Sequence, residues 1–403
     1  MLDVQPTKDL DEFRDAFLAI GQYFGAEPTD EFLDGFVKNL PLERMHGARE
    51  NGRVVGGAGA FPLTMTVPGG EVACAGVTLV GVHPTHRRRG VLRAMMRAQL
   101  DDVRERGEPI AALWASEEAI YTRFGYGLAS IQGEITLARE RSSFALPFEP
   151  AGTIELVDTD AAAAPFRAVH EAWRRATPGA FRREDAWWKY RSLADRPESR
   201  DGAGPKRLAL LERDGDAVGY AVYRHKFGFA EGASTGELRV IEAIGVDARA
   251  MAQIWRYLLD IDWNATIKAY LLPRDHPLFL LLMEPRRLRY RAGDGLWVRI
   301  VDLAAALSSR TYAEDGAVVF DVTDEFIPEN AGRWKLEGGT ATRTDDHAEL
   351  ALDVRELGSA YLGGFTFAEL ARALRVRELV PGALSRADAI FRTDVHPWCP
   401  EIF

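Results

Sequence analysis

The sequence has very little cysteine: Cys74 and Cys399 are the only two among its 403 residues. Two cysteines exclude a disulfide scaffold and a cysteine-rich metal site, and no other spacing typical of metal ligands is present, so we expect no bound metal. The sequence also lacks an apolar run of the roughly 20 residues that a membrane-spanning helix requires. Residues 1–8 carry neither the basic nor the apolar segment of a secretory signal, which favours a cytoplasmic protein.

Positive charge is also in short supply. The chain contains 50 Lys and Arg against 60 Asp and Glu, which gives a formal net charge of −10. This balance argues against general nucleic-acid binding, which requires a basic face, and it is compatible with cationic amine substrates. The consecutive arginines Arg87, Arg88 and Arg89 are a local exception, and they favour a bound polyanion.

The length of the chain predicts two or three domains, because a single hydrophobic core rarely grows beyond about 250–300 residues. Helical and strand-like patterns divide the sequence into residues 1–146, 147–293 and 294–403, with a boundary rich in proline and glycine near residue 150. In the first of these regions, a pair of helical patterns precedes a series of strands, and residues 132–137 are expected to close it as a strand. The second region repeats this order, and the third alternates strands and helices.

The stretch that organises the first region runs from Gly76 to Tyr126. Residues 76–83 form an almost continuously apolar run, which is typical of a strand buried on both faces. Residues 87–90, three arginines and a glycine, lead directly into apolar residues at helical spacing from Leu92 to Val103. Glycine lets the backbone approach a ligand closely, and the N–H groups of a helix N-terminus bind anions. The sequence therefore predicts a strand, a basic turn and a helix that together hold a pyrophosphate.

A family resemblance begins at the same turn. Arg87-x-x-Gly90-x-Leu92 resembles the Q/R-x-x-G-x-G/A signature of GCN5-related N-acetyltransferases, although Leu92 stands where the signature has a small residue. Residues 115–117 (Ala-Ser-Glu) and 120–127 (Ile-Tyr-Thr-Arg-Phe-Gly-Tyr-Gly) resemble the second half of that site. Together with the chain length and a C-terminal phenylalanine, the pattern resembles the Eis ("enhanced intracellular survival") family of actinobacterial acetyltransferases.

This resemblance implies a fold class of mixed α+β and α/β type: two tandem acetyltransferase folds followed by a sterol-carrier-protein-like α+β domain. Residues 239–247 resemble the core strand of the first fold but lack the arginine triplet and the glycine. We therefore interpret the second fold as degenerate, without a CoA turn. In the family the third domain has a packing role, so no lipid function follows from it, and its C-terminus is expected to reach the active site.

The resemblance also implies acetyl-CoA as co-substrate. We expect the turn and the start of the following helix to bind the phosphates, the preceding strand to offer backbone groups to the pantetheine arm and thioester, and the end of the next strand to contact the cofactor. The other interpretations are a solvated basic turn, core packing and a helix N-cap, respectively. The expected cofactor residues are Val80, Gly81, Val82, Arg88, Arg89, Gly90, Val91, Leu92, Arg93, Ser116 and Glu117.

Tyr121 is the predicted general acid. A phenol with a pKa near 10 is neutral at pH 7 and can protonate a departing thiolate of similar basicity. Tyr121 also matches the proton-donor position of the family motif, and Tyr126 is the competing candidate, more typical of an aromatic plug between Gly125 and Gly127.

The base follows only from the resemblance, which assigns it to the C-terminal α-carboxylate of Phe403. An α-carboxyl with a pKa of ~3.3–3.7 is a weak base in water, so this role requires burial to raise the pKa. The family has a phenylalanine two residues before its last one, where this chain has Glu401. The alternative is a terminus that is merely ordered.

Aromatic residues in the N-terminal helical segment predict an acceptor pocket that includes Phe24, Phe32 and Phe36, with Glu401 as an anion for an amine. At helical spacing the same aromatics are also typical of a core. Neither cysteine has a histidine partner that would activate it, so a covalent acetyl-cysteine route is disfavoured.

The function hypothesis is an acetyl-CoA-dependent N-acetyltransferase that acts by direct transfer on amine-rich small molecules, aminoglycoside-like, or on lysine side chains. The alternative is a non-catalytic acyl-CoA or lipid-binding protein. The resemblance further implies a homo-oligomer, with a hexamer as the candidate state.

Overall fold

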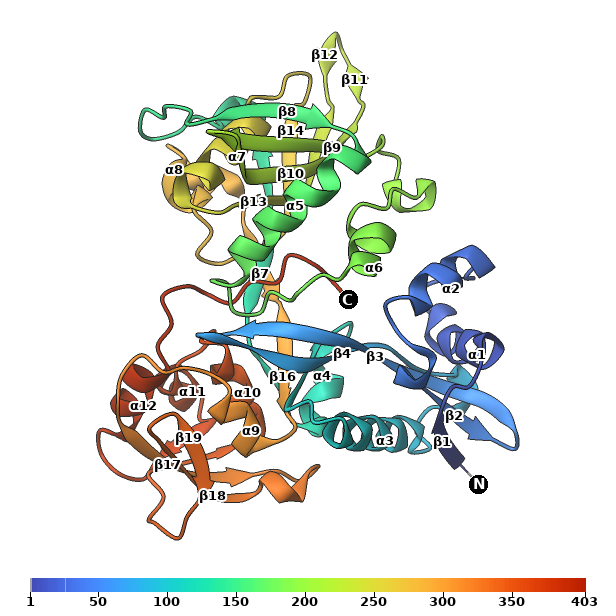
Figure 1. Ribbon diagram of the computed structural model, residues 1–403, viewed down its shortest axis with the longest axis vertical. Helices are drawn as coiled ribbons and strands as arrows, with labels where there is room; N and C mark the ends of the chain where they lie inside the picture. The colour runs from blue at the N-terminus through green and yellow to red at the C-terminus, as the bar shows by residue number, and fades with distance from the viewer. Residues whose placement is uncertain (1, 26) are drawn as a thin grey trace. The chain divides into compact units, whose positions relative to one another are not determined.

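The computed structural model describes residues 2–25 and 27–403, and the chain divides into two compact units (Figure 1). The first unit contains the chain up to residue 130 together with residues 296–397 and 402–403. The second unit contains residues 131–295 and 398–401. Within the described residues, no helix is both long enough and apolar enough to cross a membrane.

A seven-stranded sheet forms the centre of the first unit. Its strands are β1 (Leu2–Pro6), β2 (Met45–Glu50), β3 (Arg53–Val67), β4 (Gly70–Val82), β5 (Ile110–Trp114), β6 (Tyr126–Leu128) and β16 (Leu296–Ile300). Across the sheet their order is β1-β2-β3-β4-β5-β16-β6. The pair β4–β5 is parallel and all other neighbours are antiparallel.

In the part of the chain that the structure describes, four α-helices accompany this sheet: α1 (Leu10–Gly21), α2 (Asp30–Val37), α3 (Val91–Glu105) and the short α4 (Glu118–Tyr121). The two predicted N-terminal helices are confirmed. The first begins where the Asp9 side chain accepts a hydrogen bond from the backbone N–H of Glu12, and the second where Thr29 accepts one from Phe32. Such side chains satisfy N–H groups that have no partner inside the helix.

Helices α1 and α3 cover opposite faces of the sheet. A Cβ atom added to Gly56 would meet Met95 of α3, whereas one on the next residue, Gly57, would meet the Ala16 carbonyl of α1. Successive residues of a strand point to opposite faces, so the two helices must lie on different sides. Because these positions are glycines, the helix backbone can approach the strand closely.

The third predicted domain lies in the first unit and has its own five-stranded sheet with the order β19-β18-β17-β20-β21. The predicted mixture of strands and helices is confirmed. The strands are β17 (Ala317–Thr323), β18 (Gly332–Glu337), β19 (Thr340–Arg343), β20 (Leu350–Asp353) and β21 (Val376–Glu378). The helices are α9 (Leu303–Ser308), α10 (Val354–Tyr361), α11 (Phe367–Arg372) and α12 (Ala383–Phe391).

Helix α10 of this domain packs directly on strands β6 and β16 of the first sheet. A Cβ atom on Gly127 would overlap the carbonyl of Arg355, and one on Gly358 would overlap the carbonyl of Val298. The two backbones are therefore in contact, and larger side chains at these glycines would force them apart.

The second unit contains another seven-stranded sheet, with the order β15-β7-β14-β13-β10-β9-β8. Its strands are β7 (Ile131–Ala138), β8 (Thr153–Val157), β9 (Arg207–Arg213), β10 (Asp216–Lys226), β13 (Glu237–Gly245), β14 (Thr266–Pro273) and β15 (Arg291–Asp294). A separate ribbon pairs β11 (Phe229–Ala230) with β12 (Ala233–Ser234). The helices are α5 (Thr159–Arg174), α6 (Asp185–Trp187), α7 (Ala248–Asp260) and α8 (Leu278–Leu281).

The second unit repeats the central arrangement of the first. Strands β13 and β14 are parallel and are connected through α7, as β4 and β5 are connected through α3. The two helix starts differ in one respect: α7 begins at Asp247, whose carboxylate accepts from the N–H of Ala250 and pairs with Arg213 at 2.7 Å. A side-chain carboxylate thus occupies the anion position, which agrees with a fold that lacks a CoA turn.

One sequence-based expectation about the strands is wrong. Residues 132–137 do not close the first sheet; they belong to β7, which pairs with β14 and β15 in the second. The first sheet is instead completed by β16, residues 296–300. An apolar pattern identifies a strand but does not identify its neighbours, which is why the sequence order misled here. The boundaries at 146/147 and 293/294 stay predictions.

Candidate active site

Strands β4 and β5 separate at the place where the sequence predicts the cofactor. Their parallel ladder runs from Cys74 opposite Ile110 to Val77 opposite Leu113. Strand β4 continues to Val82, and among the described residues no β5 partner is paired with it beyond Val77. The backbone groups of β4 on the β5 side therefore face a gap between the strands, in which an extended ligand can pair with them.

A bulge in β4 accompanies this separation. The register with β3 passes from Gly59 opposite Thr78 to Gly57 opposite Gly81, so two residues of β4 face a single residue of β3. Leu79 lies inside the bulge with a φ of 54°. Bulges leave backbone groups outside the ladder and redirect the strand, and a non-glycine residue at positive φ is a local strain typical of functional sites.

The turn after β4 has the geometry of an anion-binding site. Arg88 has a φ of 61° and Gly90 a φ of 82°, and Gly90 is the N-cap of α3 without any side-chain hydrogen bond to the helix. The first N–H groups of a helix have no partner within it, and together with the helix dipole they attract anions. The start of α3 thus fits a pyrophosphate, in contrast to the carboxylate-capped start of α7.

The arginines of the turn point in different directions. Arg89 pairs with Glu50 at 2.7 Å, and Arg87 lies over the ring of Tyr23 at 5.8 Å. Half of the Arg89 side chain is exposed, and exposed pairs of this kind contribute little to stability, so the guanidinium can exchange Glu50 for a phosphate. Arg93 lies over the ring of Phe326 at 5.2 Å.

Tyr121 is the last residue of α4, the short helix that follows β5. It is 7% exposed, and its ring meets the Tyr126 ring edge-on at a centroid distance of 5.9 Å. Burial, and secondly the carboxylate of Glu117, raises the pKa of Tyr121 to about 12. At pH 7 the phenol is therefore fully protonated, as a proton donor must be.

Tyr126 has a different environment. It lies in β6 and is completely buried, and burial raises the pKa of its phenol well above the ordinary value. Among the described residues its hydroxyl has no hydrogen-bond partner. Its position inside the sheet suits a support for Tyr121 better than a group that meets substrate.

Ser116 and Glu117 follow β5, and both are exposed. Glu117 occupies the N-cap position of α4, but its side chain forms no capping hydrogen bond. Glu117 therefore lies at the N-cap position but does not cap the helix with its side chain. Its carboxylate can make other contacts.

Phe403 lies against strand β4. It is 6% exposed, and its ring comes within 3.2 Å of the place where Gly76 would carry a Cβ atom. Leu63 of β3 contacts the same point. Gly76 pairs with Ala112 of β5, one residue before the end of the β4–β5 ladder. The C-terminal residue thus lies beside the place where the two strands separate.

Comparisons with known proteins agree with this arrangement. Two models described as acetyltransferase (GNAT) domains match residues 4–129 and 179–300, and a sterol carrier protein domain matches residues 303–400. An uncharacterized N-acetyltransferase of Streptomyces avermitilis is 43% identical over 371 residues, 90% of each chain. N-acetyltransferase Eis of Mycobacterium tuberculosis is 37% identical over 363 residues, 87% of this chain and 86% of that protein. The crystal structure of Eis1 from Mycobacterium abscessus covers all of both chains with a TM-score of 0.88 and 34% identity.

The chain belongs to the Eis-like family of GCN5-related N-acetyltransferases. It is an N-acetyltransferase with two GNAT domains followed by a sterol-carrier-protein-like domain, as the sequence predicted.

The predicted acceptor aromatics of this Eis-family enzyme differ in burial: Phe32 and Phe36 are half-buried, whereas Phe24 is exposed. Phe32 and Phe36 of α2 belong to a ring cluster in which Phe36 contacts Phe61 of β3 at 5.5 Å. This cluster lies on the α1 face of the sheet, so core packing describes much of their surface. Phe24, in the segment after α1, is 69% exposed.

Glu401 is already paired within the second unit. Its carboxylate accepts hydrogen bonds from Arg183 Nε at 2.7 Å and from the indole N–H of Trp187 at 2.6 Å. A carboxylate that neutralises an arginine has less negative charge to offer an amine, which weakens the expectation that it attracts the acceptor.

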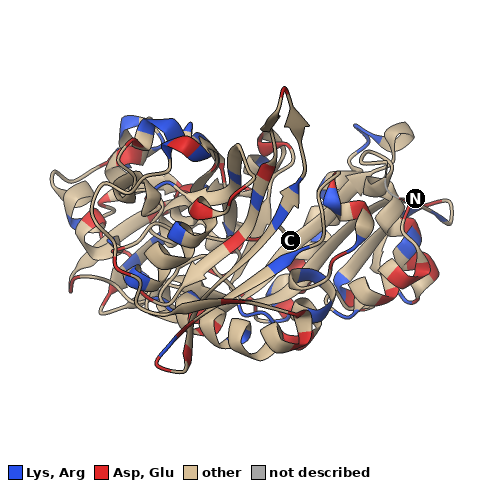
Figure 2. Cartoon of the chain, turned by 90° about the horizontal axis from the view of Figure 1, so that it is seen from above, with Lys and Arg blue, Asp and Glu red and all other residues tan. Residues whose placement is uncertain are grey.

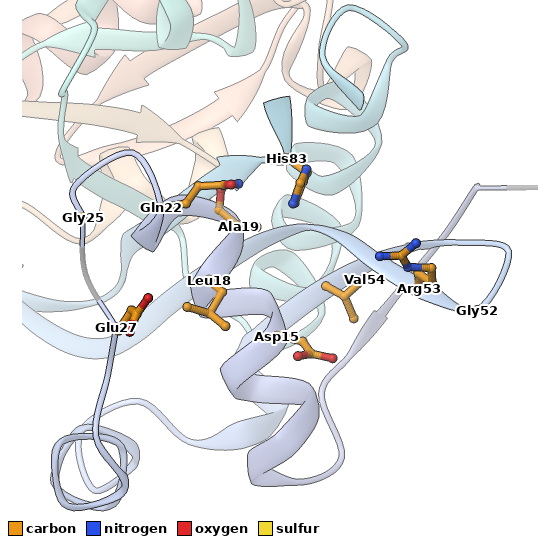
Figure 3. A pocket seen from close by; sticks show the side chains of 10 residues that line it. All are labelled: Asp15, Leu18, Ala19, Gln22, Gly25, Glu27, Gly52, Arg53, Val54 and His83. Carbon is orange, nitrogen blue, oxygen red and sulfur yellow. The ribbon is translucent and has the colours of Figure 1, made fainter. Parts of the chain in front are cut away.

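A pocket of about 660 Å³ opens beside α1 in the first unit (Figure 3). Figure 3 shows Arg53 and Val54 on one side of α1 and Glu27 on the other, with His83 at the end of β4 above them. The lining residues are Asp15, Leu18, Ala19, Gln22, Gly25, Glu27, Gly52, Arg53, Val54 and His83.

Sequence reasoning missed several residues of the site. Gly76 and Leu79 were within the predicted strand, but neither the contact with Phe403 nor the bulge leaves a signal in the sequence. Tyr23 was not singled out, although its hydroxyl donates to the Val82 carbonyl at 2.8 Å. Arg299, opposite Tyr126 in the first sheet, lies about 170 residues further along the chain, where only the structure brings it to the site.

Proposed function

We propose that this Eis-family N-acetyltransferase moves the acetyl group of acetyl-CoA directly to an amino group of the acceptor. The observation that carries the proposal is the combination of an uncapped start of α3 with the separated ends of β4 and β5. The helix start suits the phosphates of CoA, and the separated strands suit an extended thioester arm. The exposed position of Ser116 and Glu117 at the end of β5 suits further contacts with the cofactor.

In this proposal the backbone N–H groups of Val91, Leu92 and Arg93 bind the pyrophosphate, with Arg88 and Arg89 nearby. The backbone of Val80, Gly81 and Val82 pairs with the pantetheine arm and polarises the thioester carbonyl. Attack by the amine forms the new C–N bond and breaks the C–S bond. Tyr121 gives its proton to the sulfur, so that CoA leaves as a thiol.

The C-terminal carboxylate of Phe403 takes the proton from the attacking amine. The support for this role is the place of the residue: its ring lies on Gly76, beside the end of the β4–β5 ladder. A carboxylate there is near the strand that holds the thioester, on the face of the sheet that also carries α1 and the aromatic cluster.

The proposed acceptors are amine-rich small molecules, aminoglycoside-like, or lysine side chains. The net charge of −10 and the carboxylates of Asp15 and Glu27 at the pocket beside α1 favour a cationic ligand. Figure 2 shows acidic residues interleaved with basic ones, so local groups such as these decide where a cation is attracted.

The test of this function is acetyl-CoA-dependent thiol release with a panel of polyamines and aminoglycosides. The native chain is compared with a chain that carries one extra glycine after Phe403. The added residue moves the terminal carboxylate away from its place but keeps the ring on Gly76. We expect turnover to fall at least about a hundredfold, within the usual contribution of a general base, with CoA affinity unchanged. Equal turnover of both chains would exclude the carboxylate as the base.

A second variant tests the role of the Phe403 carboxylate by a change in strand β4. Gly76→Ala places a methyl group against Leu63 and the Phe403 ring, so the tail must move. The control is Gly47→Ala in β2, whose added methyl meets nothing closer than the Arg49 side chain at 3.6 Å. We expect turnover to fall in the first variant only.

We further propose that the enzyme acts in the cytoplasm as a homo-oligomer, with a hexamer as the expected state. This proposal follows from the family resemblance, since single exposed apolar side chains such as Leu280 at 88% and Leu374 at 95% are ordinary on a protein surface. Light scattering of the purified protein measures the number of copies directly.

A further inference from the structure

A buried ion pair connects the sterol-carrier-protein-like domain to the first sheet. Arg299 of β16 donates to both carboxylate oxygens of Asp324, which follows β17, at 2.9 and 2.8 Å. The exposed fractions of the two side chains are 0% and 1%. Taking two charges out of water costs more than such a pair usually returns, so its presence calls for a reason beyond stability.

Asp324 is held firmly in place. Its carboxylate accepts from the N–H groups of Phe326 and Ile327 at 3.1 and 2.9 Å and from the side-chain amide of Asn330 at 3.1 Å. The amide of Asn330 in turn donates to the backbone of β16 at Ile300. The turn after β17 therefore fixes the position of Asp324 and, through it, that of the Arg299 guanidinium.

The guanidinium fills the space under the turn that leads from α4 into β6. A Cβ atom on Gly125 would come within 2.6 Å of Arg299 Nη1, so only glycine leaves room for it. In the sheet, Arg299 stands directly opposite Tyr126, which places their side chains next to each other on one face. Among the described residues Arg299 Nε and Nη1 and the Tyr126 hydroxyl have no hydrogen-bond partner.

Tyr126 connects Arg299 to Tyr121 through ring packing. The two rings meet edge-on at 5.9 Å, and Phe124, between them in the chain, packs edge-on against Phe326 at 5.1 Å. The segment from residue 121 to 126 is thus fixed through its aromatic rings to the turn that begins at Asp324.

We propose that Arg299, held by Asp324, is a positioning residue for the acid: it fixes Gly125 and Tyr126 so that the Tyr126 ring holds the Tyr121 phenol toward the sulfur. This inference rests on the proposed role of Tyr121 in the reaction. It gives the turn after β17 a role in placing the proposed acid, although this turn does not itself contact substrate.

The experiment replaces the pair with neutral groups of similar size, Arg299→Met together with Asp324→Asn, so that no unpaired charge stays buried. We expect kcat to fall about tenfold or more, as for a misplaced catalytic group, and KM for acetyl-CoA to change less than about twofold. The matched control is the pair Arg44→Met with Glu108→Gln. Arg44 and Glu108 form a comparable pair, in which Arg44 Nη2 donates to both carboxylate oxygens at 3.0 and 2.9 Å and the two side chains are 3% and 8% exposed. We expect the control variant to have a lower melting temperature and an unchanged kcat.

Combining the Arg299–Asp324 replacement with a change at Tyr121 distinguishes a positioning role of Arg299 from a general structural role. In a Tyr121→Phe background, which lacks the phenolic proton, replacing the Arg299–Asp324 pair is expected to cause no further loss of kcat. Losses that multiply would show that Arg299 acts elsewhere and would overturn the inference, while the role of Tyr121 would stand. Full kcat in Tyr121→Phe alone would instead remove the proposed acid, and the inference with it.

A conservative variant covers the case in which the double replacement does not fold. Arg299→Lys keeps the charge beside Asp324 but loses the flat group beneath Gly125. We expect a partial loss of kcat with normal acetyl-CoA binding. A kcat equal to that of the native chain would overturn the positioning role of the guanidinium.

Discussion

At the scale of single residues, a raised pKa distinguishes Tyr121, the proposed proton donor, from an ordinary phenol. Burial and the nearby Glu117 raise its pKa to about 12. A raised pKa keeps the acid protonated at every pH below that value, so Tyr121 should cause no loss of activity on the alkaline side. We expect kcat measured from about pH 6 to 10 to show no alkaline decline from this group.

The measurement is the pH profile of kcat with saturating substrates. Tyr121→Phe should lower kcat by about 10²–10⁴-fold, the usual contribution of a general acid, at every pH of the series. Tyr126→Phe provides a comparison, because it removes a buried hydroxyl and keeps the ring that packs on Tyr121. An alkaline decline near pH 8 in the native enzyme that disappears in Tyr121→Phe would contradict the assigned pKa.

At the scale of the elements, the start of α3 depends on Gly90. This residue has a φ of 82°, which costs a residue with a side chain about 1–2 kcal/mol. In Gly90→Ala the turn can relieve this strain by rotating, and the N–H groups of Val91 and Leu92 then turn away from the phosphates. We expect the Kd for CoA, measured by calorimetry, to rise about tenfold, equivalent to about 1.4 kcal/mol.

Gly107, directly after the other end of α3, offers a matched control for Gly90. Its φ is 72°, and as at Gly90 an added Cβ would meet nothing within 4 Å. Gly107→Ala should therefore lower the melting temperature by a similar amount and leave CoA binding intact. Equal CoA affinity in both variants would show that the turn does not bind the cofactor.

The elements also show what a sequence can predict here. The β4–turn–α3 segment and its repeat around β13 and α7 are local patterns, in which apolar periodicity and turn residues decide the structure. The assignment of strands to sheets is not local: β7, expected to close the first sheet, joined the second, and β16, which lies within the predicted third region, completed the first. The same limit applies to side chains, since the contact of Phe403 with Gly76 and that of Arg299 with Tyr126 join distant segments of the chain.

At the scale of the whole molecule, the end of the chain enters the core of the second unit before its last two residues return to the first. Trp398 packs edge-on against Trp173 at 5.0 Å, its backbone N–H donates to Pro178, and its indole N–H donates to Leu271. The Cys399 carbonyl accepts from the Gln132 side chain at 2.8 Å. Conditions that loosen this core therefore also release the segment that ends in Phe403.

Acid is such a condition, because His276 lies beside this tail. Its ring is buried between Trp255 at 5.2 Å and Trp398 at 6.0 Å, and its Nδ1 accepts from the N–H of Leu278. Burial lowers its pKa to about 3, whereas in the unfolded chain a histidine titrates near 6.5. The unfolded state thus binds more protons below about pH 6.5, so this contribution to stability is complete above that pH and is lost progressively toward pH 3.

We therefore expect the free energy of unfolding of the second unit to fall by about 2–3 kcal/mol between about pH 7.5 and 4.5 on account of His276 alone. His276→Asn removes the titrating group and keeps an oxygen that can accept from Leu278, so its stability should depend less on pH by that amount. Urea unfolding followed by tryptophan fluorescence measures the difference, since Trp255 and Trp398 flank the histidine. The native chain, measured over the same pH series, is the reference. If His276→Asn retained the native pH dependence, protonation of His276 would not be the cause of the acid destabilisation of this core, and a loss of turnover in acid would have to begin at the active site itself.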